Sequence, residues 1–257
     1  MVGDHQGRMM NELALFAGAG GGLLASKLLG WSTICAVEIE PFSRSVLLKR
    51  QADGHLERFP IWNDVCTFDG NPWRGSVDIV SGGFPCQNIS SAGKREGITG
   101  KSSSLIFEML RIIAEVQPQV VFAENSPELR SNGLGAIITT LAGMGYDCAW
   151  CVLGAWHAGA PHRRNRLWLV ACNTNSKSKS KRTINAKMAR VPQSDEGSNA
   201  WQDEPALERM GDGVANRMDQ LRAIGNGQVP AVAAMAFEIL MNTLRKTPNG
   251  GNNETED

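Results

Sequence analysis

Residues 13–21, with the sequence LALFAGAGG, decide the fold of this chain. The apolar residues 13–16 predict a short buried strand, and the glycines after them predict a tight turn into a helix over about 21–30. Glycines between a strand and a helix let a ligand approach the backbone closely, at the positive end of the helix. The stretch therefore predicts the first unit of an α/β sheet, with a ligand site at its turn.

The same alternation of strands and helices continues along the chain. Further strands are predicted at 34–37, 77–80, 120–123, about 147–153 and about 166–171. Further helices are predicted at about 42–51, about 103–116, and from Pro230 to about 245. Short strands that alternate with helices of this length indicate right-handed crossovers. We therefore predict an α/β fold with a doubly wound, mostly parallel sheet.

Length and composition limit the class of protein. The 257 residues suit one large domain, or one domain with a small appendage. The 26 basic and 26 acidic residues balance, which argues against non-specific coating of nucleic acid but leaves room for a local basic face. No apolar stretch is long enough to span a membrane, no secretory signal is evident, and six cysteines are too few for a disulfide scaffold. These features predict a cytoplasmic enzyme.

The glycine-rich turn and a downstream acid predict a nucleotide-type ligand. Glu38 ends the second predicted strand, 20 residues after Gly18, where an acid accepts hydrogen bonds from ribose hydroxyls in dinucleotide sites. A tight turn and a surface glutamate would be the simpler interpretation. Leu23 occupies the position of the third glycine in a nicotinamide-binding motif, and no Gly-Lys-Ser/Thr sequence is present to bind phosphates. The pocket therefore suits an adenosine ligand without a pyrophosphate, which indicates S-adenosylmethionine.

A reactive cysteine is predicted at residues 81–87, SGGFPCQ. The two glycines and Pro85 are expected to end the strand and fix Cys86 on a loop, where a thiolate can be activated. A small packing cysteine is the alternative. Glu124, at the end of the next strand, could protonate a heterocycle or simply cap a helix. Ligands of open α/β sheets bind beyond the carboxyl ends of the strands, where both residues fall.

Five short motifs occur in order along the chain. They are FAGAGG (16–21), GFPCQ (83–87), EN (124–125), RNR (164–166) and GNGQVP (225–230). Together they resemble the ordered motifs of DNA (cytosine-5) methyltransferases, over about residues 12–172 and 221–245. The resemblance implies a Rossmann-like S-adenosylmethionine-dependent methyltransferase fold. Ser126 and Pro127 depart from the family, which usually has Val after the Glu-Asn pair.

The resemblance implies roles for the reactive residues. Cys86 would add to C6 of a cytosine flipped out of the duplex, and Glu124 would hold N3 and the exocyclic amine. Arg166 would reach O2 of the base, with Arg164 in support. Residues two apart share one face of a strand, so these arginines are expected to lie together, although a solvated basic edge is the alternative.

The resemblance also implies a set of cofactor residues. Phe16 would pack on adenine, Glu38 would bind the ribose, Asp64 would lie near the adenine amine, and Asn226 would close the methionine end. The complete predicted cofactor site is Phe16, Gly18, Gly20, Gly21, Glu38, Asp64, Pro85 and Asn226.

The composition changes beyond Cys172, and this change defines the predicted domains. Residues 173–194 carry six Lys or Arg and no acid, whereas 195–212 carry six acids and one Arg. We expect a catalytic domain over 11–172, a small loop-rich recognition insertion over 173–220 and a returning segment over 221–246, with a flexible leader (1–10) and a disordered tail (247–257). This resembles the compact, phage-associated members of the family. The predicted DNA contacts are Gln87, Ser90, Lys177, Lys179, Lys181 and Arg182, although the basic block could also be a solvated loop.

The resemblance also implies binding partners for the protein, and other functions remain as alternatives. The expected substrate is double-stranded DNA, a cognate restriction endonuclease is an optional partner, and a bacterial or phage-encoded monomer is expected. An RNA cytosine-5 methyltransferase, a catalytically silent DNA-binding module and a nicotinamide-dependent oxidoreductase remain alternatives. Cys148 and Cys151 have C-x-x-C spacing without a second pair, so we interpret them as packing cysteines that face opposite sides of a strand, and we predict no metal site.

Overall fold

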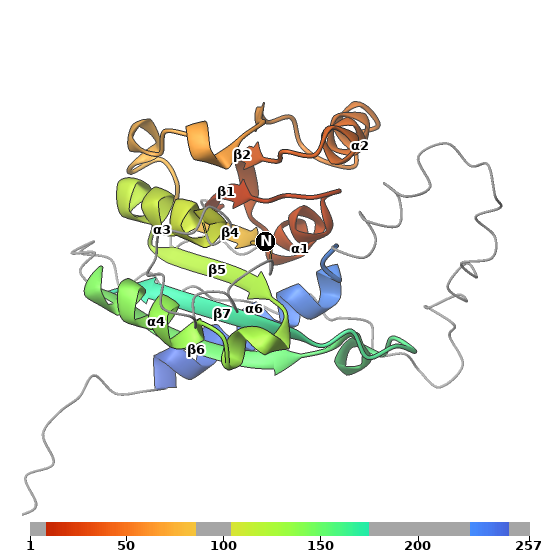
Figure 1. Cartoon of the computed structure of the whole chain (residues 1–257). Helices are drawn as coiled ribbons and strands as arrows, with labels where there is room; N and C mark the ends of the chain where they lie inside the picture. The colour runs from red at the N-terminus through yellow and green to blue at the C-terminus, as the bar shows by residue number, and fades with distance from the viewer. Residues whose placement is uncertain (1–8, 86–103, 175–226, 247–257) are drawn as a thin grey trace, which may run out of the picture.

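The computed structural model describes residues 9–85, 104–174 and 227–246, and within these ranges the chain forms a seven-stranded sheet with helices on both faces (Figure 1). The strands are β1 (Asn11–Leu15), β2 (Ser32–Val37), β3 (Ile61–Trp62), β4 (Ile79–Gly83), β5 (Val120–Asn125), β6 (Tyr146–Leu153) and β7 (Arg166–Asn173). The helices are α1 (Gly21–Leu29), α2 (Pro41–Ala52), α3 (Ser104–Val116), α4 (Leu134–Gly143) and α6 (Pro230–Lys246).

The strand order is β3-β2-β1-β4-β5-β7-β6. The pairs from β3 to β5 are parallel, whereas β7 runs antiparallel to both β5 and β6. The predicted doubly wound, mostly parallel sheet is therefore confirmed. Because β7 is reversed, its first residue, Arg166, lies at the same edge of the sheet as the last residues of β1, β4 and β5.

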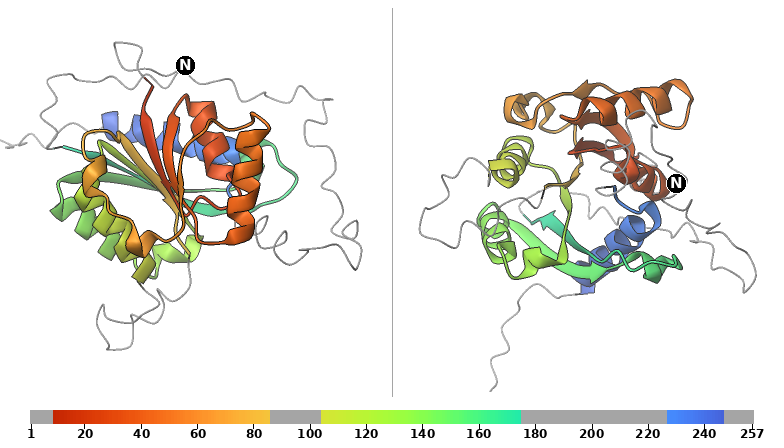
Figure 2. Two further views of the ribbon diagram at one scale, coloured as in Figure 1. Left: turned by 90° about the horizontal axis from the view of Figure 1, so that it is seen from above. Right: turned by 45° about the vertical axis from the view of Figure 1, so that its right-hand side comes forward.

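Both faces of the sheet are buried, as the apolar strands predicted. Along β5, Val121 and Ala123 point into the core beneath α3 and α4, while Val120 and Phe122 point into the core beneath α1 and α6. In the second core, the Trp31 and Phe237 rings meet edge to face, with their centroids 4.7 Å apart. Figure 2 shows the helices on both sides of the twisted sheet.

Every predicted strand and helix is present, with ends that shift by a few residues. Ser81, Gly82 and Gly83 are the last three residues of β4, and the strand ends before Phe84 and Pro85, as predicted. A Cβ on Gly82 would lie 2.7 Å from the Leu15 carbonyl oxygen, so the missing side chain lets β1 and β4 approach closely.

Two elements, α4 and β3, were not predicted. Helix α4 packs Leu134, Ile137 and Leu141 into the core, but its glycines and β-branched residues weaken the helical signal. Strand β3 is only two residues long, so no alternation of polar and apolar residues could identify it.

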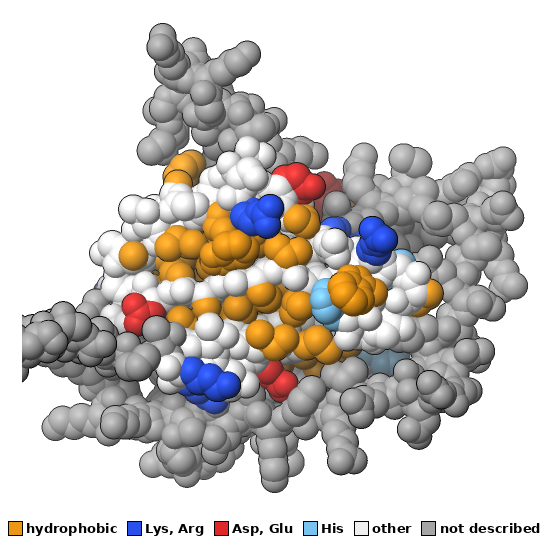
Figure 3. Space-filling model, turned by 90° about the horizontal axis from the view of Figure 1, so that it is seen from below, with side chains coloured by type: hydrophobic (Ala, Val, Ile, Leu, Met, Phe, Trp, Pro, Cys, Tyr) orange, Lys and Arg blue, Asp and Glu red, His pale blue; other side chains and the backbone are white. Residues whose placement is uncertain are grey.

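The sheet ends at β6, which pairs only with β7 among the described strands. Exposed Trp150 and Ile239 lie on β6 and α6, and Figure 3 shows hydrophobic side chains gathered over the face on this side of the molecule. Within the described ranges, no helix combines the length and apolar character of a membrane span. Residues 175–220 of the predicted insertion and the predicted tail lie outside the described residues, and the domain boundaries stay predictions.

Candidate functional site

The glycine-rich turn after β1 forms one wall of a pocket at the carboxyl edge of the sheet. Strand β1 ends at Leu15, so Phe16 follows the strand instead of ending it, with a φ of 53°. Gly18 and Gly20 have φ values of 55° and 92°, in the left-handed region that favours glycine. A Cβ on Gly18 would meet no atom within 4 Å, so the backbone there faces open space that a ligand can fill.

Glu38 lies directly against this turn. Its side chain is only 7% exposed, and its Oε2 accepts a hydrogen bond of 2.6 Å from the Gly18 backbone N–H. Its Oε1 accepts one of 2.8 Å from the Glu40 N–H. Each carboxylate oxygen has a further lone pair, so this acid can shape the turn and still accept a ligand hydroxyl.

Asp64 is the acid that is predicted to lie near the adenine amine, and it follows a segment that is hydrogen-bonded to the backbone of Glu38. The Glu38 N–H donates to the carbonyl of Trp62, two residues before Asp64. The Asp64 carboxylate accepts from the Cys66 N–H at 2.9 Å and caps a short 3-10 helix, Val65–Thr67. Asp64 does not line the pocket, so its role stays a prediction.

The ends of β4 and β5 bring Glu124 beneath the segment that leads to Cys86. Gly83 and Glu124 are paired in the sheet, and a Cβ on Gly83 would lie 2.6 Å from Glu124 Oε2. The buried Asn125 donates through Nδ2 to the Phe84 carbonyl at 3.0 Å, which ties the end of β5 to the chain after β4. Exposed Pro85 is the last described residue there, and Cys86, Gln87 and Ser90 lie outside the described residues.

Two arginines converge on Glu124. Arg166 Nε lies 2.9 Å from Glu124 Oε1 in an ion pair that is mostly buried. The prediction that Arg164 lies on the same strand is wrong, because β7 begins at Arg166 and Arg164 precedes it with a φ of 35°. The Arg164 guanidinium nevertheless points to the site, where it donates to the Gly227 carbonyl.

The environment of Glu124 raises the pKa of its carboxyl. Burial raises its pKa, whereas Arg166, the hydrogen bond from Gln228 and Arg164 each lower it, and the net direction is upward. The side chain is 8% exposed, so desolvation is the dominant cause. A carboxyl whose pKa is raised by burial and lowered by a nearby guanidinium is suited to exchange a proton with a bound base.

Gln228 joins the two walls, and the sequence analysis did not identify it individually. Its Nε2 donates to Glu124 Oε2 at 3.5 Å, and a Cβ on Gly22 would lie 2.8 Å from its Oε1. A Cβ on Gly21 would overlap its backbone carbonyl oxygen. Its place inside the GNGQVP motif was the available signal. Asn226, from the same motif, lies outside the described residues.

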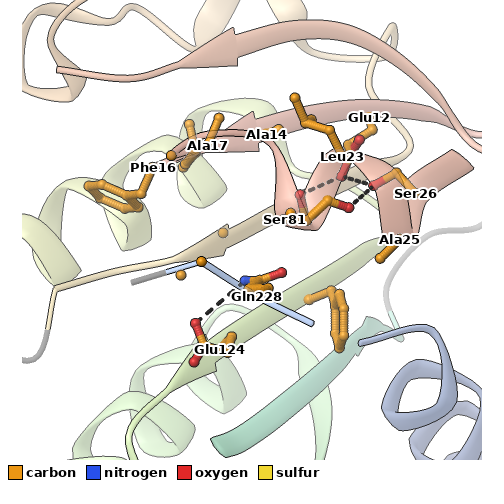
Figure 4. Close-up of a pocket in the computed structure, with 18 of the residues that line it drawn as sticks. Glu12, Ala14, Phe16, Ala17, Leu23, Ala25, Ser26, Ser81, Glu124 and Gln228 are labelled. Carbon is orange, nitrogen blue, oxygen red and sulfur yellow. Dashed lines mark hydrogen bonds between the residues drawn. The ribbon is translucent and has the colours of Figure 1, made fainter. Parts of the chain in front are cut away.

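The glycine-rich turn, the ends of β4 and β5, and Gln228 line a pocket of about 600 Å³, part of which is open to solvent. Figure 4 shows Phe16 and Ala17 on one side and Glu124 with Gln228 on the other, while Glu12, Ser26 and Ser81 lie deeper. The structure therefore brings together four of the predicted residues, Phe16, Gly18, Gly21 and Glu124. Gly20, Pro85, Arg164 and Arg166 do not line the pocket, and Glu38 meets it only through its hydrogen bond from Gly18. Lys177, Lys179, Lys181 and Arg182 lie outside the described residues.

The two cysteines with C-x-x-C spacing lie on β6, and their packing is confirmed. Cys148 packs against the core beneath α3 and α4, and Cys151 packs against the core beneath α1 and α6. Burial raises the pKa of each thiol to about 11.

A family model described as C-5 cytosine-specific DNA methylase matches residues 10–234. The matched range contains the glycine-rich turn, Glu124, both arginines and Gln228.

Curated relatives are similar in sequence. A type II methyltransferase of Escherichia coli, M.Eco47II, is 34% identical over 168 residues, which cover 62% of this chain and 38% of that protein. M.CviJI of a Paramecium bursaria Chlorella virus, also named a type II methyltransferase, is 34% identical over 161 residues, which cover 62% of this chain and 42% of that protein. The chain thus matches about two fifths of the length of these relatives.

Solved structures share the fold. The Dnmt2 methyltransferase of S. pombe has a TM-score of 0.53 and 20% identity, and the match covers 64% of this chain and 51% of that one. The methyltransferase EhMeth of Entamoeba histolytica has a TM-score of 0.56 and 18% identity, with 66% and 55% covered.

Proposed function

Because the chain belongs to the C-5 cytosine-specific DNA methylase family, we propose that it transfers a methyl group from S-adenosylmethionine to C5 of cytosine in double-stranded DNA. The observation that carries the proposal is the position of Glu124. This buried acid is paired with Arg166 and lies against Gly83, three residues before Cys86. A buried acid, a glycine-lined pocket and the end of the strand that precedes Cys86 therefore meet in one place, which supports the proposal.

The residues of the pocket fit the cofactor. The open space at Gly18 admits a ligand to the backbone, and Glu38 has lone pairs for ribose hydroxyls. Phe16 is half-buried at the pocket and offers a ring for adenine. When bound, S-adenosylmethionine supplies an electrophilic methyl group. Gly20, Gly21, Asp64, Pro85 and Asn226 complete the proposed cofactor residues.

Cys86 would act as the nucleophile. C5 of cytosine is a weak nucleophile, and addition of the Cys86 thiolate to C6 gives an enamine whose C5 carries negative charge. After C5 has accepted the methyl group, loss of the C5 proton breaks the S–C6 bond and releases the thiolate. The reacting atoms are inaccessible within a duplex, so the cytosine must be flipped out.

Glu124 and the arginines would hold the flipped base. A protonated Glu124 carboxyl donates to N3, which draws electrons away from C6 and favours attack by the thiolate. Arg166 then reaches O2 of the base while it orients Glu124. Arg164, through the Gly227 carbonyl, keeps the segment that contains Gln228 next to both.

A trapping experiment tests this proposal. Duplex DNA that contains 5-fluorocytosine should form a stable covalent complex with the wild type, because fluorine at C5 cannot leave as a proton does. Cys86→Ala should form none, while Cys66→Ala, which changes an exposed cysteine, should trap as the wild type does. Trapping that survives in Cys86→Ala would rule out this nucleophile. Trapping on 5-fluorocytosine RNA in place of the duplex would favour the RNA alternative.

A further inference from the structure

The floor of the pocket contains a buried acid that the proposed reaction does not use. Glu12, in β1, is 1% exposed. Its Oε1 accepts from Ser81 Oγ at 2.5 Å and from Ser26 Oγ at 2.7 Å, and its Oε2 accepts from Thr33 Oγ1 at 2.6 Å. Figure 4 shows Glu12, Ser26 and Ser81 joined in this way on the β1 side of the pocket. One carboxyl group therefore connects β1 to α1, β2 and β4.

The hydrogen-bond geometry accommodates a proton on this carboxyl. Ser26 Oγ lies 2.7 Å from Glu12 Oε1 and 3.1 Å from the Gly22 carbonyl oxygen, but a hydroxyl has a single proton to donate. If Glu12 is ionised, the Ser26 proton can serve only one of two acceptors, so the Gly22 carbonyl keeps only its partner within α1 while Glu12 Oε1 accepts from Ser26 and Ser81. If Glu12 is protonated, it donates to Ser26, and Ser26 donates to Gly22.

The surroundings support the same protonation state. The polar groups that contact Glu12 from α1, β2 and β4 are three neutral hydroxyls, and none offers a countercharge. Burial raises the pKa of Glu12, and the three hydroxyl hydrogen bonds lower it by less. An ionised carboxylate without a countercharge is costly in the interior of a protein.

The chain of hydrogen bonds leads from Glu12 to both walls of the pocket. Gly22 lies in the first turn of α1, and the Gln228 side chain packs closely against it. On the other side, Ser81 begins the last three residues of β4, which end at Gly83 beside Glu124. A change at Glu12 therefore reaches the glycine-rich turn and the catalytic acid together.

We infer that Glu12 is a positioning residue whose protonated carboxyl fixes the first turn of α1 and the end of β4 in the shape that binds the cofactor. This inference rests on the proposed function. When Glu12 loses its proton, the Ser26 hydroxyl must donate to the carboxylate, and the Gly22 carbonyl loses its side-chain partner. Cofactor affinity should therefore fall as the pH rises.

Three variants isolate the proton. In Glu12→Gln, the amide NH₂ can donate to Ser26 and Ser81 while its oxygen accepts from Thr33, so all three hydroxyls keep a link to the side chain, with Ser81 as an acceptor instead of a donor, and no titrating group remains. Ser26→Ala keeps the acid but removes the link to Gly22. Glu57→Gln is the matched control, because exposed Glu57 also accepts from a serine, Ser32, but lies away from the pocket.

The measurement is the dissociation constant of S-adenosylhomocysteine by calorimetry, from pH 5.5 to 9. For the wild type and Glu57→Gln we expect affinity to fall by about tenfold as the pH rises through the raised pKa of Glu12, the effect of one lost hydrogen bond. Glu12→Gln should show no such fall, and Ser26→Ala should bind weakly at every pH. The same fall in Glu12→Gln, or affinity for Ser26→Ala equal to that of the wild type, would overturn the inference.

Urea unfolding across the same pH range separates this inference from the proposed function. A folded-state pKa above the unfolded value makes stability fall as the pH rises, and Glu12→Gln should remove that contribution. If no variant binds S-adenosylhomocysteine, the proposed function fails, while the unfolding data still report on the proton. Identical slopes for the wild type and Glu12→Gln would show that Glu12 is ionised in the fold, which contradicts the inference.

Discussion

Two buried glutamates at the pocket differ in their partners. Glu124 has a guanidinium, Arg166, and Glu12 has three hydroxyls, yet burial raises the pKa of both. Glu124 was predictable, because an acid at the end of a buried strand has few reasons to be there other than function. The burial of Glu12 was not predictable, because a charged residue near the start of a short strand such as NELAL usually faces solvent. Only the packing of α1 over β1, and the place of β1 between β2 and β4 in the sheet, show that it is internal.

The role of Glu124 leads to a prediction about the chemical step. Glu124→Gln keeps the size of the side chain and one acceptor but cannot give a proton to N3. The methyl-transfer rate should fall by roughly 10²–10⁴, the usual contribution of a positioned acid or base. Single-turnover methylation of duplex DNA measures this rate independently of product release.

Two outcomes of that measurement have distinct meanings. A rate within threefold of the wild type would reduce Glu124 to a structural role. Wild-type affinity for S-adenosylhomocysteine, measured in parallel, serves as the control that the pocket is intact.

At the scale of elements, close backbone contacts assemble the site. The segment before α6 crosses the glycine-rich turn so closely that only glycine fits at position 21. The sequence predicted that the turn and the C-terminal motif both contribute, from their order in the chain. It could not show that Gln228 is the point of contact, because that depends on how α6 packs against α1.

This contact predicts a difference between two glycines. Gly21→Ala places a methyl group on the Gln228 backbone, which must shift and take its side chain away from Glu124. We expect a loss of about 1–3 kcal/mol in the free energy of unfolding, typical of overpacking, with weaker binding of S-adenosylhomocysteine. Chemical denaturation and calorimetry measure the two effects.

Gly135→Ala is the matched control. Gly135 lies in α4, and a Cβ there would meet no atom within 4 Å. Alanine is favoured over glycine in a helix by about 1 kcal/mol, so this variant should be at least as stable as the wild type and bind the ligand equally well. If both variants behave alike, the close approach of Gln228 is not what requires glycine at position 21.

At the scale of the whole molecule, strand order determines which residues meet. The alternation of strands and helices predicted the layers, and the carboxyl ends of β1, β2, β4 and β5 were expected to share one edge. The reversal of β7 was not predicted, because strand direction depends on long-range pairing and leaves no mark in local sequence. That reversal brings the Arg166 guanidinium to the Glu124 carboxylate. The arginine motif was therefore identified by resemblance, whereas its ion-pair partner became evident only from the fold.

The basic block of the proposed recognition insertion provides the last prediction. Lys177, Lys179, Lys181 and Arg182 lie among residues without an acid, so they suit a segment that follows phosphates. Replacing all four with Gln should weaken binding to duplex DNA at low salt. It should also flatten the slope of log K against log salt, by up to about one unit per lost phosphate contact.

Sequence preference should not change in this variant, because phosphate contacts carry no direct information about the bases. Bisulfite sequencing of DNA from cells that express each protein compares the methylated sites, and Lys49→Gln with Lys246→Gln provides a control for charge on the described surface. The same sites at lower occupancy would assign base recognition to other residues, such as Gln193, Asn199, Gln202 or Arg209. A new set of sites at unchanged affinity would instead make the basic block itself the reader, because a side chain that only neutralises phosphate cannot redirect the enzyme to another sequence.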